Sequence, residues 1–246
     1  MPEGPSLVLL KEDILHFRRK KVKKAAGNAA IDVQLLEGKT LTEIQTWGKQ
    51  LFLVFTGKLT VRIHLLMFGS YSVDEQIRPK RSVRLQLEFA NGTIYFYTCS
   101  VRLLEPGWKE EYDWTADIMS DKWNARGARK KLGENPDMLA CDALLDQQIF
   151  SGSGNIIKNE VLFRIYLHPE SRIGKLPPSV LTALIREARN YSFDFLKWKR
   201  NYELKKHWLI IAKKVCPRCN IAVVKKYLGK TKRRTFFCNN CQKKYE

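Results

Sequence analysis

Residues 216–241 read CPRCNIAVVKKYLGKTKRRTFFCNNC, and this stretch decides the fold of the carboxyl-terminal part of the chain. Two Cys-x-x-Cys pairs are separated by 18 residues. Four thiolates at this spacing suit a tetrahedral Zn²⁺ site of the zinc-ribbon type, which leaves no coordination position open for chemistry. We therefore expect Zn²⁺ as a structural cofactor, with a rubredoxin-like iron site as the alternative. The expected ligands are Cys216, Cys219, Cys238 and Cys241.

A β-hairpin would bring the two cysteine pairs together. Residues 221–228 and 233–237 are its predicted strands, because both are rich in residues that favour extended backbone. Basic residues gather at the hairpin tip and on the returning strand, namely Lys225, Lys226, Lys230, Lys232, Arg233 and Arg234. The metal is therefore expected to present a basic finger to a phosphate backbone.

The charge of the whole chain supports the same kind of partner. Lys and Arg number 44 against 25 Asp and Glu, and the formal net charge of the 246 residues is +19. Residues 197–246 carry sixteen of the basic residues and two of the acidic ones, so most of the excess lies there. Such a field favours nucleic acid first and an anionic membrane surface a distant second. A merely soluble basic protein is the plain alternative.

Cysteine usage and hydropathy indicate the compartment. No apolar run approaches the 18 residues of a membrane span, and the first residues lack the features of a secretory signal, so we expect no membrane association. In an intracellular protein, Cys99 and Cys141 are expected to be buried packing residues rather than a disulfide. The cluster Arg18–Lys24 would contact phosphate or serve as a nuclear address. We expect a cytoplasmic, nucleoid-associated protein in a bacterium, or a nuclear one in a eukaryote.

Upstream of the cysteines, residues 115–200 have helical spacing. Residues 138–150 and 155–167 are amphipathic, and the tight link Ser151–Gly154 joins them as in a helix-turn-helix unit. A further helix is predicted near 178–198, after two prolines.

Residues 31–105 have a different sequence pattern, with short runs typical of β-strands at 51–55, 59–66, 82–89 and 93–97. They predict a β-sandwich or flattened barrel, preceded by a helix within residues 1–24 whose apolar positions are Leu7, Leu10, Ile14 and Phe17. The predicted fold class is α+β, an N-terminal helix and β-sandwich followed by a helical helix-two-turn-helix domain and a four-cysteine zinc ribbon. The predicted domain bounds are 1–114, 115–212 and 213–246.

The start of the chain, Met-Pro-Glu-Gly-Pro, is chemically unusual. Removal of the initiator Met would leave Pro2 with a free secondary amine, which titrates near pH ~8 and is partly unprotonated at neutral pH. Attack of this amine on an aldehyde-like carbon gives an iminium that acidifies the neighbouring C–H. Glu3 would then act as proton donor and acceptor. A stiff N-terminal turn without catalysis is the alternative reading of these residues.

Taken together, these residues resemble the formamidopyrimidine-DNA glycosylase/endonuclease VIII family. The Pro-Glu-Gly-Pro start is similar to the family's, and so is Gly48-Lys49 before an apolar strand. The segment His64–Gly69 resembles its intercalation loop, and Leu144–Gln147 followed by Gly152–Asn155 and Glu160 resembles its helix-two-turn-helix. Arg233–Cys238 with Cys241-Gln242 resembles its zinc finger.

The resemblance implies a reaction that these residues can support. Pro2 would attack C1′ of the damaged nucleoside, displace the base and form a Schiff base. Glu3 would protonate the sugar, and β- then δ-elimination would leave a one-nucleotide gap with phosphate ends. Lys49 would bind a phosphate beside the lesion and assist catalysis; without the resemblance it is an ordinary exposed strand lysine.

The resemblance also implies DNA-binding residues. Asn155 and Arg233 would donate to the phosphate that flanks the lesion, with Arg234 as the rival if the hairpin register slips. For Asn155 a helix N-cap is the alternative role, and both roles are compatible. Leu66, Met67 and Phe68 would fill the stack that the extruded base vacates, and core packing is their alternative.

The expected partner is damaged double-stranded DNA, bound by a monomer. The oxidised-purine enzymes carry an Arg-Arg-Phe-Gly element where this chain has Val101–Leu104, and their lesion-capping loop is also missing. Both differences favour an endonuclease VIII-like preference for oxidised pyrimidines. The rivals are an oxidised-purine glycosylase for 8-oxoguanine or formamidopyrimidine, and a non-catalytic zinc-ribbon DNA-binding protein.

Overall fold

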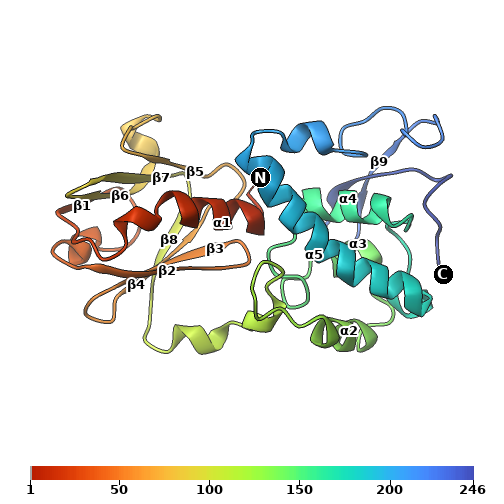
Figure 1. The fold of residues 1–246 in the computed structure, drawn as a ribbon, viewed down its shortest axis with the longest axis horizontal. Helices are drawn as coiled ribbons and strands as arrows, with labels where there is room; N and C mark the ends of the chain where they lie inside the picture. The colour runs from red at the N-terminus through yellow and green to blue at the C-terminus, as the bar shows by residue number, and fades with distance from the viewer. Residues whose placement is uncertain (1) are drawn as a thin grey trace. The chain divides into compact units, whose positions relative to one another are not determined.

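The computed structural model describes residues 2–246, which form two compact units. Pro2 and Ser6–Tyr112 make up the first unit, and Glu3–Pro5 with Asp113–Glu246 make up the second (Figure 1). The cysteine-rich segment therefore belongs to the same compact unit as the helices. Whether the three predicted segments fold independently stays a prediction, because compactness alone does not test it.

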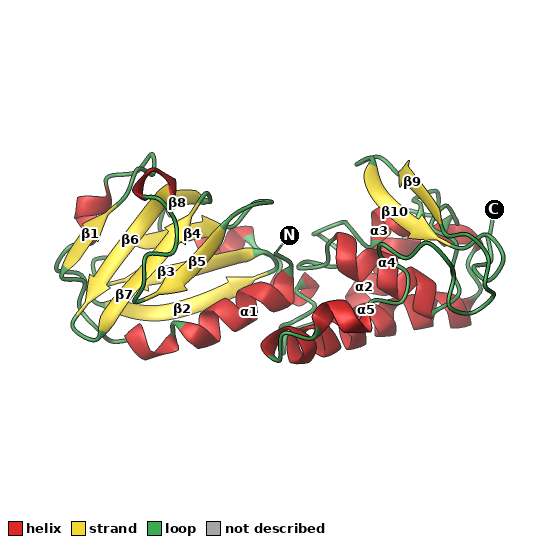
Figure 2. Ribbon diagram, turned by 90° about the horizontal axis from the view of Figure 1, so that it is seen from above, coloured by secondary structure: helices red, strands yellow, loops and turns green. Residues whose placement is uncertain are grey.

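Two four-stranded antiparallel sheets form the first unit (Figure 2). In one sheet the order is β1 (Lys24–Ala26), β6 (Val83–Phe89), β7 (Gly92–Tyr97) and β5 (Ser70–Val73). In the other it is β2 (Leu41–Trp47), β3 (Gln50–Phe55), β4 (Thr60–His64) and β8 (Ser100–Leu104). Apolar side chains alternate inward along β6, as expected of a strand with one buried face. The predicted α+β class, with its β-sandwich, is confirmed.

The N-terminal helix is shorter than the sequence predicts. Helix α1 spans Gly4–Asp13, and one 3₁₀ turn follows at Leu15–Phe17. Beyond it the chain turns at residues 18–19, where Arg19 has φ of 66°, and the N–H groups of Arg19 and Val22 donate to the carbonyls of Leu41 and Lys39. The expected helix therefore ends early because residues 19–22 pair with another segment. The four predicted apolar positions, Leu7, Leu10, Ile14 and Phe17, are fully buried in the sandwich core.

Within residues 113–246, four helices and a hairpin form the second unit. The helices are α2 (Ala125–Gly133), α3 (Ala140–Ala143), α4 (Asn155–Arg164) and α5 (Pro178–Arg200), and the hairpin strands are β9 (Val224–Leu228) and β10 (Arg233–Phe237). Short 3₁₀ turns join the longer elements of both units, at Val33–Leu36, Lys80–Ser82, Trp108–Glu111, Trp114–Ala116, Ile173–Lys175 and Leu204–His207.

The prediction of a helix over residues 138–150, the first helix of the helix-turn-helix, is mostly wrong. Only Ala140–Ala143 is helical, and residues 144–153 form a series of turns. The Gln147 amide explains this, because its oxygen accepts from the Gly152 N–H and its nitrogen donates to the carbonyls of Leu145 and Ser153. These contacts replace the hydrogen bonds of a helix. Helix α5, in contrast, begins at the second proline as predicted.

Two predictions about single residues and membranes are also testable on this structure. Cys99 and Cys141 are buried, and burial raises the pKa of each thiol to about 12, so they are inert packing residues. Within residues 2–246, no helix combines the length and apolar character that crossing a bilayer requires.

Candidate functional site

The carboxylate of Glu3 lies on the N-terminus of α4. Its Oε2 accepts hydrogen bonds from the N–H groups of Gly154 (3.1 Å) and Ile157 (3.2 Å), and its Oε1 accepts one from Ile156 (2.7 Å). Glu3 has no solvent-exposed surface. The first turn of a helix has unsatisfied N–H groups and a positive dipole end, so it stabilises a buried anion there.

Small residues make this contact possible. The N–H of Gly4 donates to the carbonyl of Gly152 at 2.8 Å, which holds residues 3–5 against the turn before α4. A Cβ on Gly154 would lie 2.5 Å from Cδ of Glu3 and 2.6 Å from its Oε1. Only glycine therefore fits at position 154 while Glu3 keeps its place.

Asn155 is the first residue of α4, and the residue before it, Gly154, is the N-cap. The alternative role of Asn155 as an N-cap is therefore wrong, and Glu3 supplies the cap from a distant part of the sequence. The Asn155 Oδ1 atom is buried without a hydrogen-bond partner among the described residues.

Two buried polar side chains fasten α4 to strand β10. The Lys158 ammonium donates to Thr235 Oγ1 at 2.8 Å and to the carbonyl of Arg234 at 3.3 Å. The Asn159 amide accepts from the N–H of Phe236 at 2.8 Å. Burial lowers the pKa of Lys158 to about 8, against the opposing effect of Cys141, Asp142 and Glu3. This lysine was not predicted as a site residue.

The hairpin register separates Arg233 from Arg234. Successive side chains of β10 point to opposite faces, so Arg233 shares the face of Thr235, which meets Lys158. Arg234 pairs with Tyr227 on β9, donates to its hydroxyl at 3.3 Å and lies over its ring. Of the two predicted candidates, Arg233 is the one that faces α4.

The hairpin tip is held as well. Both carboxylate oxygens of Asp142 accept from the N–H of Lys230, at 3.0 and 3.2 Å. A Cβ on Gly229 would lie 2.2 Å from the same carboxylate. The tip of the basic hairpin is thus fixed against α3.

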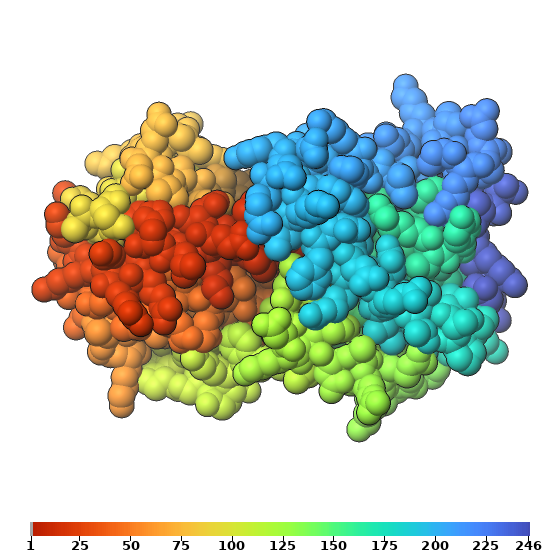
Figure 3. Space-filling model, viewed as in Figure 1, coloured from red at the N-terminus to blue at the C-terminus, as the bar shows by residue number. Residues whose placement is uncertain are grey.

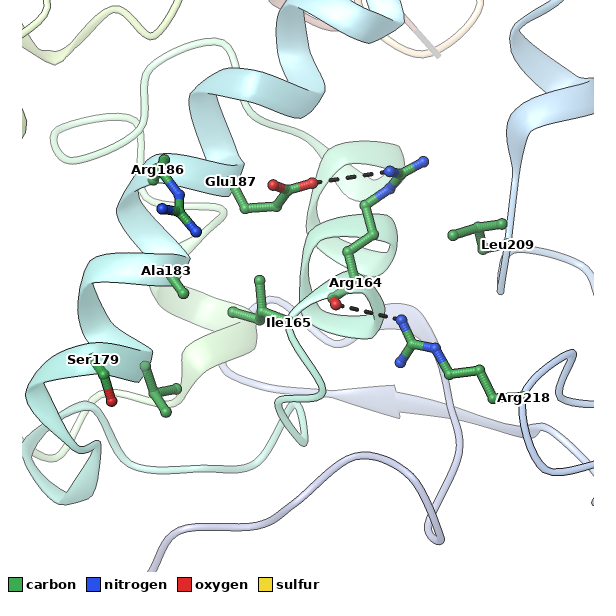
Figure 4. A pocket seen from close by; sticks show the side chains of 9 residues that line it. Arg164, Ile165, Ser179, Ala183, Arg186, Glu187, Leu209 and Arg218 are labelled. Carbon is green, nitrogen blue, oxygen red and sulfur yellow. Dashed lines mark hydrogen bonds and ion pairs between the residues drawn. The ribbon is translucent and has the colours of Figure 1, made fainter.

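Further contacts join the cysteine segment to α4. The fully buried Glu160 accepts hydrogen bonds from the N–H groups of Leu209, Ile210 and Ile211. At the other end of the helix, the Arg218 guanidinium donates to the carbonyls of Phe163 (2.7 Å) and Arg164 (3.3 Å) (Figure 4). Arg218 thereby satisfies carbonyls that the helix C-terminus leaves open.

The four predicted metal ligands lie together. Their sulfur atoms are all within 4.8 Å of one another, with 3.7 Å between Cys216 and Cys241 and 3.2 Å between Cys219 and Cys238. Tetrahedral bonds of about 2.3 Å to zinc place sulfurs about 3.8 Å apart, so the cluster fits Zn²⁺ after small adjustments. Four cysteines would hold the metal in a closed structural site.

Lys49 lies in the turn between β2 and β3 of the first unit. It is near His64, whose pKa is lowered by burial and then by the positive charges of Lys49 and Arg62. A neutral imidazole can accept a hydrogen bond, and His64 Nδ1 does so from the N–H of Leu66 at 3.0 Å. Lys49 is thus placed beside the start of the predicted intercalation loop.

The three predicted wedge residues project into solvent. Leu66, Met67 and Phe68 are 50%, 48% and 72% exposed, whereas the preceding Leu65 is buried. The N–H of Gly69 donates to the carbonyl of Leu65 at 2.8 Å and closes the loop. Core packing, the alternative role of these residues, is wrong for all three.

The structure thus groups the predicted residues by unit. Glu3, Asn155, Arg233 and the cysteines belong to the second unit, together with the unpredicted Lys158. Lys49 and the three wedge residues belong to the first unit, as does the half-buried Pro2. The sequence signal for Lys158 was a lysine placed among the apolar residues of an amphipathic helix.

The features described so far, a Pro-Glu start, a β-sandwich and a helical unit with a four-cysteine cluster, agree with the family that the sequence resembles, and so do comparisons with known proteins. The model of the family described as formamidopyrimidine-DNA glycosylase N-terminal domain matches residues 1–104. Endonuclease 8-like 3 of Mus musculus is 31% identical over 218 residues, which are 86% of this chain and 36% of that protein. Endonuclease 8-like 2 of Bos taurus is 35% identical over 72% of this chain and 56% of that protein.

A solved structure shows the same fold. It is the formamidopyrimidine-DNA glycosylase of Lactococcus lactis, non-covalently bound to DNA that contains an abasic site. The TM-score is 0.86 over 98% of this chain and 100% of that one, at 22% identity. The chain belongs to the formamidopyrimidine-DNA glycosylase/endonuclease VIII family. It spans 36% and 39% of the length of the endonuclease 8-like 3 proteins of mouse and Xenopus laevis.

The contact between Glu3 and α4 predicts the effect of one added methyl group. Gly154→Ala should lower the free energy of unfolding by about 1–3 kcal/mol, because its Cβ displaces the Glu3 carboxylate. Gly133→Ala is the matched control, since its Cβ meets no atom within 4 Å and alanine favours a helix. Chemical denaturation measures both. Equal stability of the two variants would show that Gly154 is not restricted by Glu3.

The cysteine cluster predicts a metal content. Purified protein should contain about one Zn²⁺ per chain, and Cys238→Ser should lose it because a ligand is removed. Cys99→Ser, which alters a buried cysteine of the first unit, should keep the metal. Elemental analysis measures both variants. Stoichiometric zinc in Cys238→Ser, or iron in the unaltered protein, would refute the assignment.

Proposed function

We propose that this chain is a bifunctional DNA glycosylase and abasic-site lyase of base excision repair that acts through the N-terminal amine of Pro2. The observation that carries the proposal is the anchored carboxylate of Glu3. Three backbone N–H groups fix the residue that follows the nucleophile, so the nitrogen of Pro2 is bonded to a chain segment with little freedom. Positioning of this kind supplies a large part of the rate enhancement in covalent catalysis.

In the proposed reaction, the Pro2 nitrogen forms a bond to C1′ as the bond from C1′ to the damaged base breaks. The base leaves with a proton from water, the ring oxygen takes the proton that the Pro2 nitrogen loses as the C1′–oxygen bond opens, and an iminium joins Pro2 to C1′. Loss of a proton from C2′ then expels the 3′ phosphate, and loss of a proton from C4′ expels the 5′ phosphate. Hydrolysis of the iminium by water releases the sugar fragment and restores the Pro2 amine. Both phosphates leave as ends of the gapped strand.

Glu3 is suited above all to stabilise positive charge on Pro2. Both of its oxygens accept backbone hydrogen bonds, an arrangement that complements an ionised carboxylate. An ionised carboxylate on the residue that follows Pro2 would stabilise the iminium electrostatically. The proton transfer that the family resemblance implies for Glu3 requires one of these hydrogen bonds to open.

The remaining residues bind DNA in this proposal. Asn155 and Arg233 hold the phosphate beside the lesion through their side chains, since Asn155 is the first residue of α4 and Arg233 faces that helix. Lys49 binds a second phosphate. The exposed side chains of residues 66–68 enter the base stack when the damaged base leaves it. Zinc, when bound by the four cysteines, holds the basic hairpin in its fold.

Oxidised pyrimidines are the proposed lesions and damaged duplex DNA the proposed partner, bound by a monomer. The endonuclease 8-like names of the relatives support this choice. Solved proteins of the same fold are described in complex with abasic DNA and with 8-oxoguanine DNA, which keeps the oxidised-purine reaction as the second candidate. A panel of thymine glycol, 5-hydroxyuracil and 8-oxoguanine oligonucleotides separates the two.

Borohydride trapping tests the nucleophile. On DNA with an abasic site, reduction should yield a covalent adduct, and mass spectrometry should map the sugar to the peptide that begins with Pro2. A form that keeps one residue before Pro2 should bind this DNA and form no adduct, because the amine is then an amide. An adduct on a lysine, or efficient trapping by the extended form, would overturn the mechanism. Gel shifts without any adduct would identify the non-catalytic rival.

The two neighbouring arginines give a matched pair. Arg233→Ala should weaken binding of abasic-site DNA roughly tenfold and reduce the slope of log K against log salt by about one, because one phosphate contact is lost. Arg234→Ala should have a smaller effect, since its side chain is held by Tyr227. Salt titrations followed by fluorescence anisotropy measure both slopes. A larger loss in Arg234→Ala would mean that the hairpin register is shifted in the complex.

A further inference from the structure

A groove between α2 and α5 gathers arginines around an apolar surface. Its volume is about 350 Å³, and among residues 2–246 no carboxylate lines it. Both helices lie on one face of the second unit (Figure 3). We call it the arginine groove and define it by six of the residues that line it: Trp123, Arg126, Arg129, Ile185, Arg186 and Arg189.

Two of the four arginines already have structural roles. Arg189 donates to the carbonyls of Ile118 (3.2 Å) and Ser120 (2.9 Å), and Arg129 donates to Thr182. In contrast, the side chains of Arg126 and Arg186 are exposed and form no hydrogen bond or ion pair with the described residues; only the backbone N–H of Arg126 is used, by the Asn124 cap of α2. These two guanidinium groups are therefore available to a ligand.

Positive charge continues beyond the groove along α5. Arg186 also borders a second depression of about 570 Å³, to which Arg164 and Arg218 contribute (Figure 4). Among the described residues, the one carboxylate there belongs to Glu187, which lies 4.0 Å from Arg164 and partly balances its charge. The two depressions together follow α5 from residue 179 to residue 190, about 18 Å of helix. This length suits an extended polyanion rather than a single carboxylate or phosphate.

The apolar surface narrows the choice of polyanion. In duplex DNA the bases are stacked and paired, so only phosphates and base edges reach a protein surface. An apolar pocket between guanidinium groups is filled by an unstacked base, whose face packs on an indole or a guanidinium plane. Arginine supports this binding better than lysine because its planar group both stacks and pairs with phosphate.

We propose that the arginine groove binds single-stranded nucleic acid, with a base against Trp123 and backbone phosphates on Arg126 and Arg186. This site is separate from the candidate site within the second unit. None of the residues that define the arginine groove supplies the N–H groups that hold Glu3, and none belongs to helix α4 or strand β10. The groove needs no damaged base and would hold an unpaired strand independently of the glycosylase reaction.

Charge-matched variants of the full, zinc-bound chain test the proposal. The probe is a lesion-free oligothymidine of about 12 nucleotides, followed by fluorescence anisotropy over a salt series. Arg126→Gln with Arg186→Gln should weaken binding roughly tenfold and lower the salt slope by about 1.4, because two contacts to a single strand are lost. The control, Lys80→Gln with Lys175→Gln, removes the same charge from exposed sites and should change affinity roughly twofold or less.

Photocrosslinking gives a second readout. An oligonucleotide that carries 5-iodouracil should crosslink to the peptide containing Trp123, and the Arg126/Arg186 variant should lose this crosslink. Crosslinks that map only elsewhere, with equal affinity in variant and control, would overturn the proposal. Protection of the Trp123 peptide by poly-glutamate and not by oligothymidine would overturn it as well, since the groove would then be a protein-docking surface.

Borohydride trapping on abasic duplex DNA keeps the two proposals distinguishable. The Arg126/Arg186 variant should form as much adduct as the unaltered chain, because neither residue lies in the candidate site. Absence of trapping in the unaltered chain would refute the glycosylase/lyase proposal and leave the oligothymidine result intact.

Discussion

The contact between Glu3 and helix α4 solves two energetic problems at once. A carboxylate buried without partners costs several kcal/mol, roughly, and the open N–H groups of a buried helix start carry a penalty of their own. Gly154 has no side chain with which to cap the helix, and Glu3 has no solvent-exposed surface. Each supplies what the other lacks. As a consequence, the proposed nucleophile Pro2 is bonded to a residue, Glu3, that is held by a helix beginning at residue 155.

Helix α4 holds strand β10 and the segments around the cysteine cluster in place. Lys158 and Asn159 hold strand β10, Glu160 holds residues 209–211, and Arg218 closes the C-terminal end. A metal bound by the cysteines would fix the hairpin internally, but its four ligands set no orientation toward the helix. That orientation comes from the buried polar side chains. The metal and the helix therefore do different work, since one maintains the shape of the basic finger and the other determines where its arginine points.

Local patterns in the sequence predicted those features that local physics determines. Alternating apolar runs located β3, β4, β6 and β7, the double proline located the start of α5, and cysteine spacing located the cluster. Strand β2 was missed because its buried residues, Leu41, Ile44 and Trp47, are three apart rather than alternating, and its register shifts between Leu41 and Glu43. The cap of α4 was missed because donor and acceptor are about 150 residues apart in the chain. Lys158 follows two isoleucines of an amphipathic helix, but its polar partner Thr235 lies 77 residues further along the chain, where no local pattern reveals it.

The exposed loop at residues 66–68 follows from how its ends are held. Leu66 has a left-handed backbone, with φ of 55°, which costs an L-residue about 1–2 kcal/mol. Hydrogen bonds from the N–H of Leu66 to His64 and from the N–H of Gly69 to Leu65 offset that cost, and a guanidinium N–H of Arg78 donates to the carbonyl of Phe68. A Cβ on Gly69 would lie 2.1 Å from the Leu65 carbonyl oxygen, so the closure requires glycine. The backbone thus keeps three apolar side chains away from a core that could have buried them. Exposure of these apolar side chains to water is unfavourable, and insertion into a base stack would remove that cost. The loop is therefore better suited to a wedge that enters DNA than to a simple surface turn.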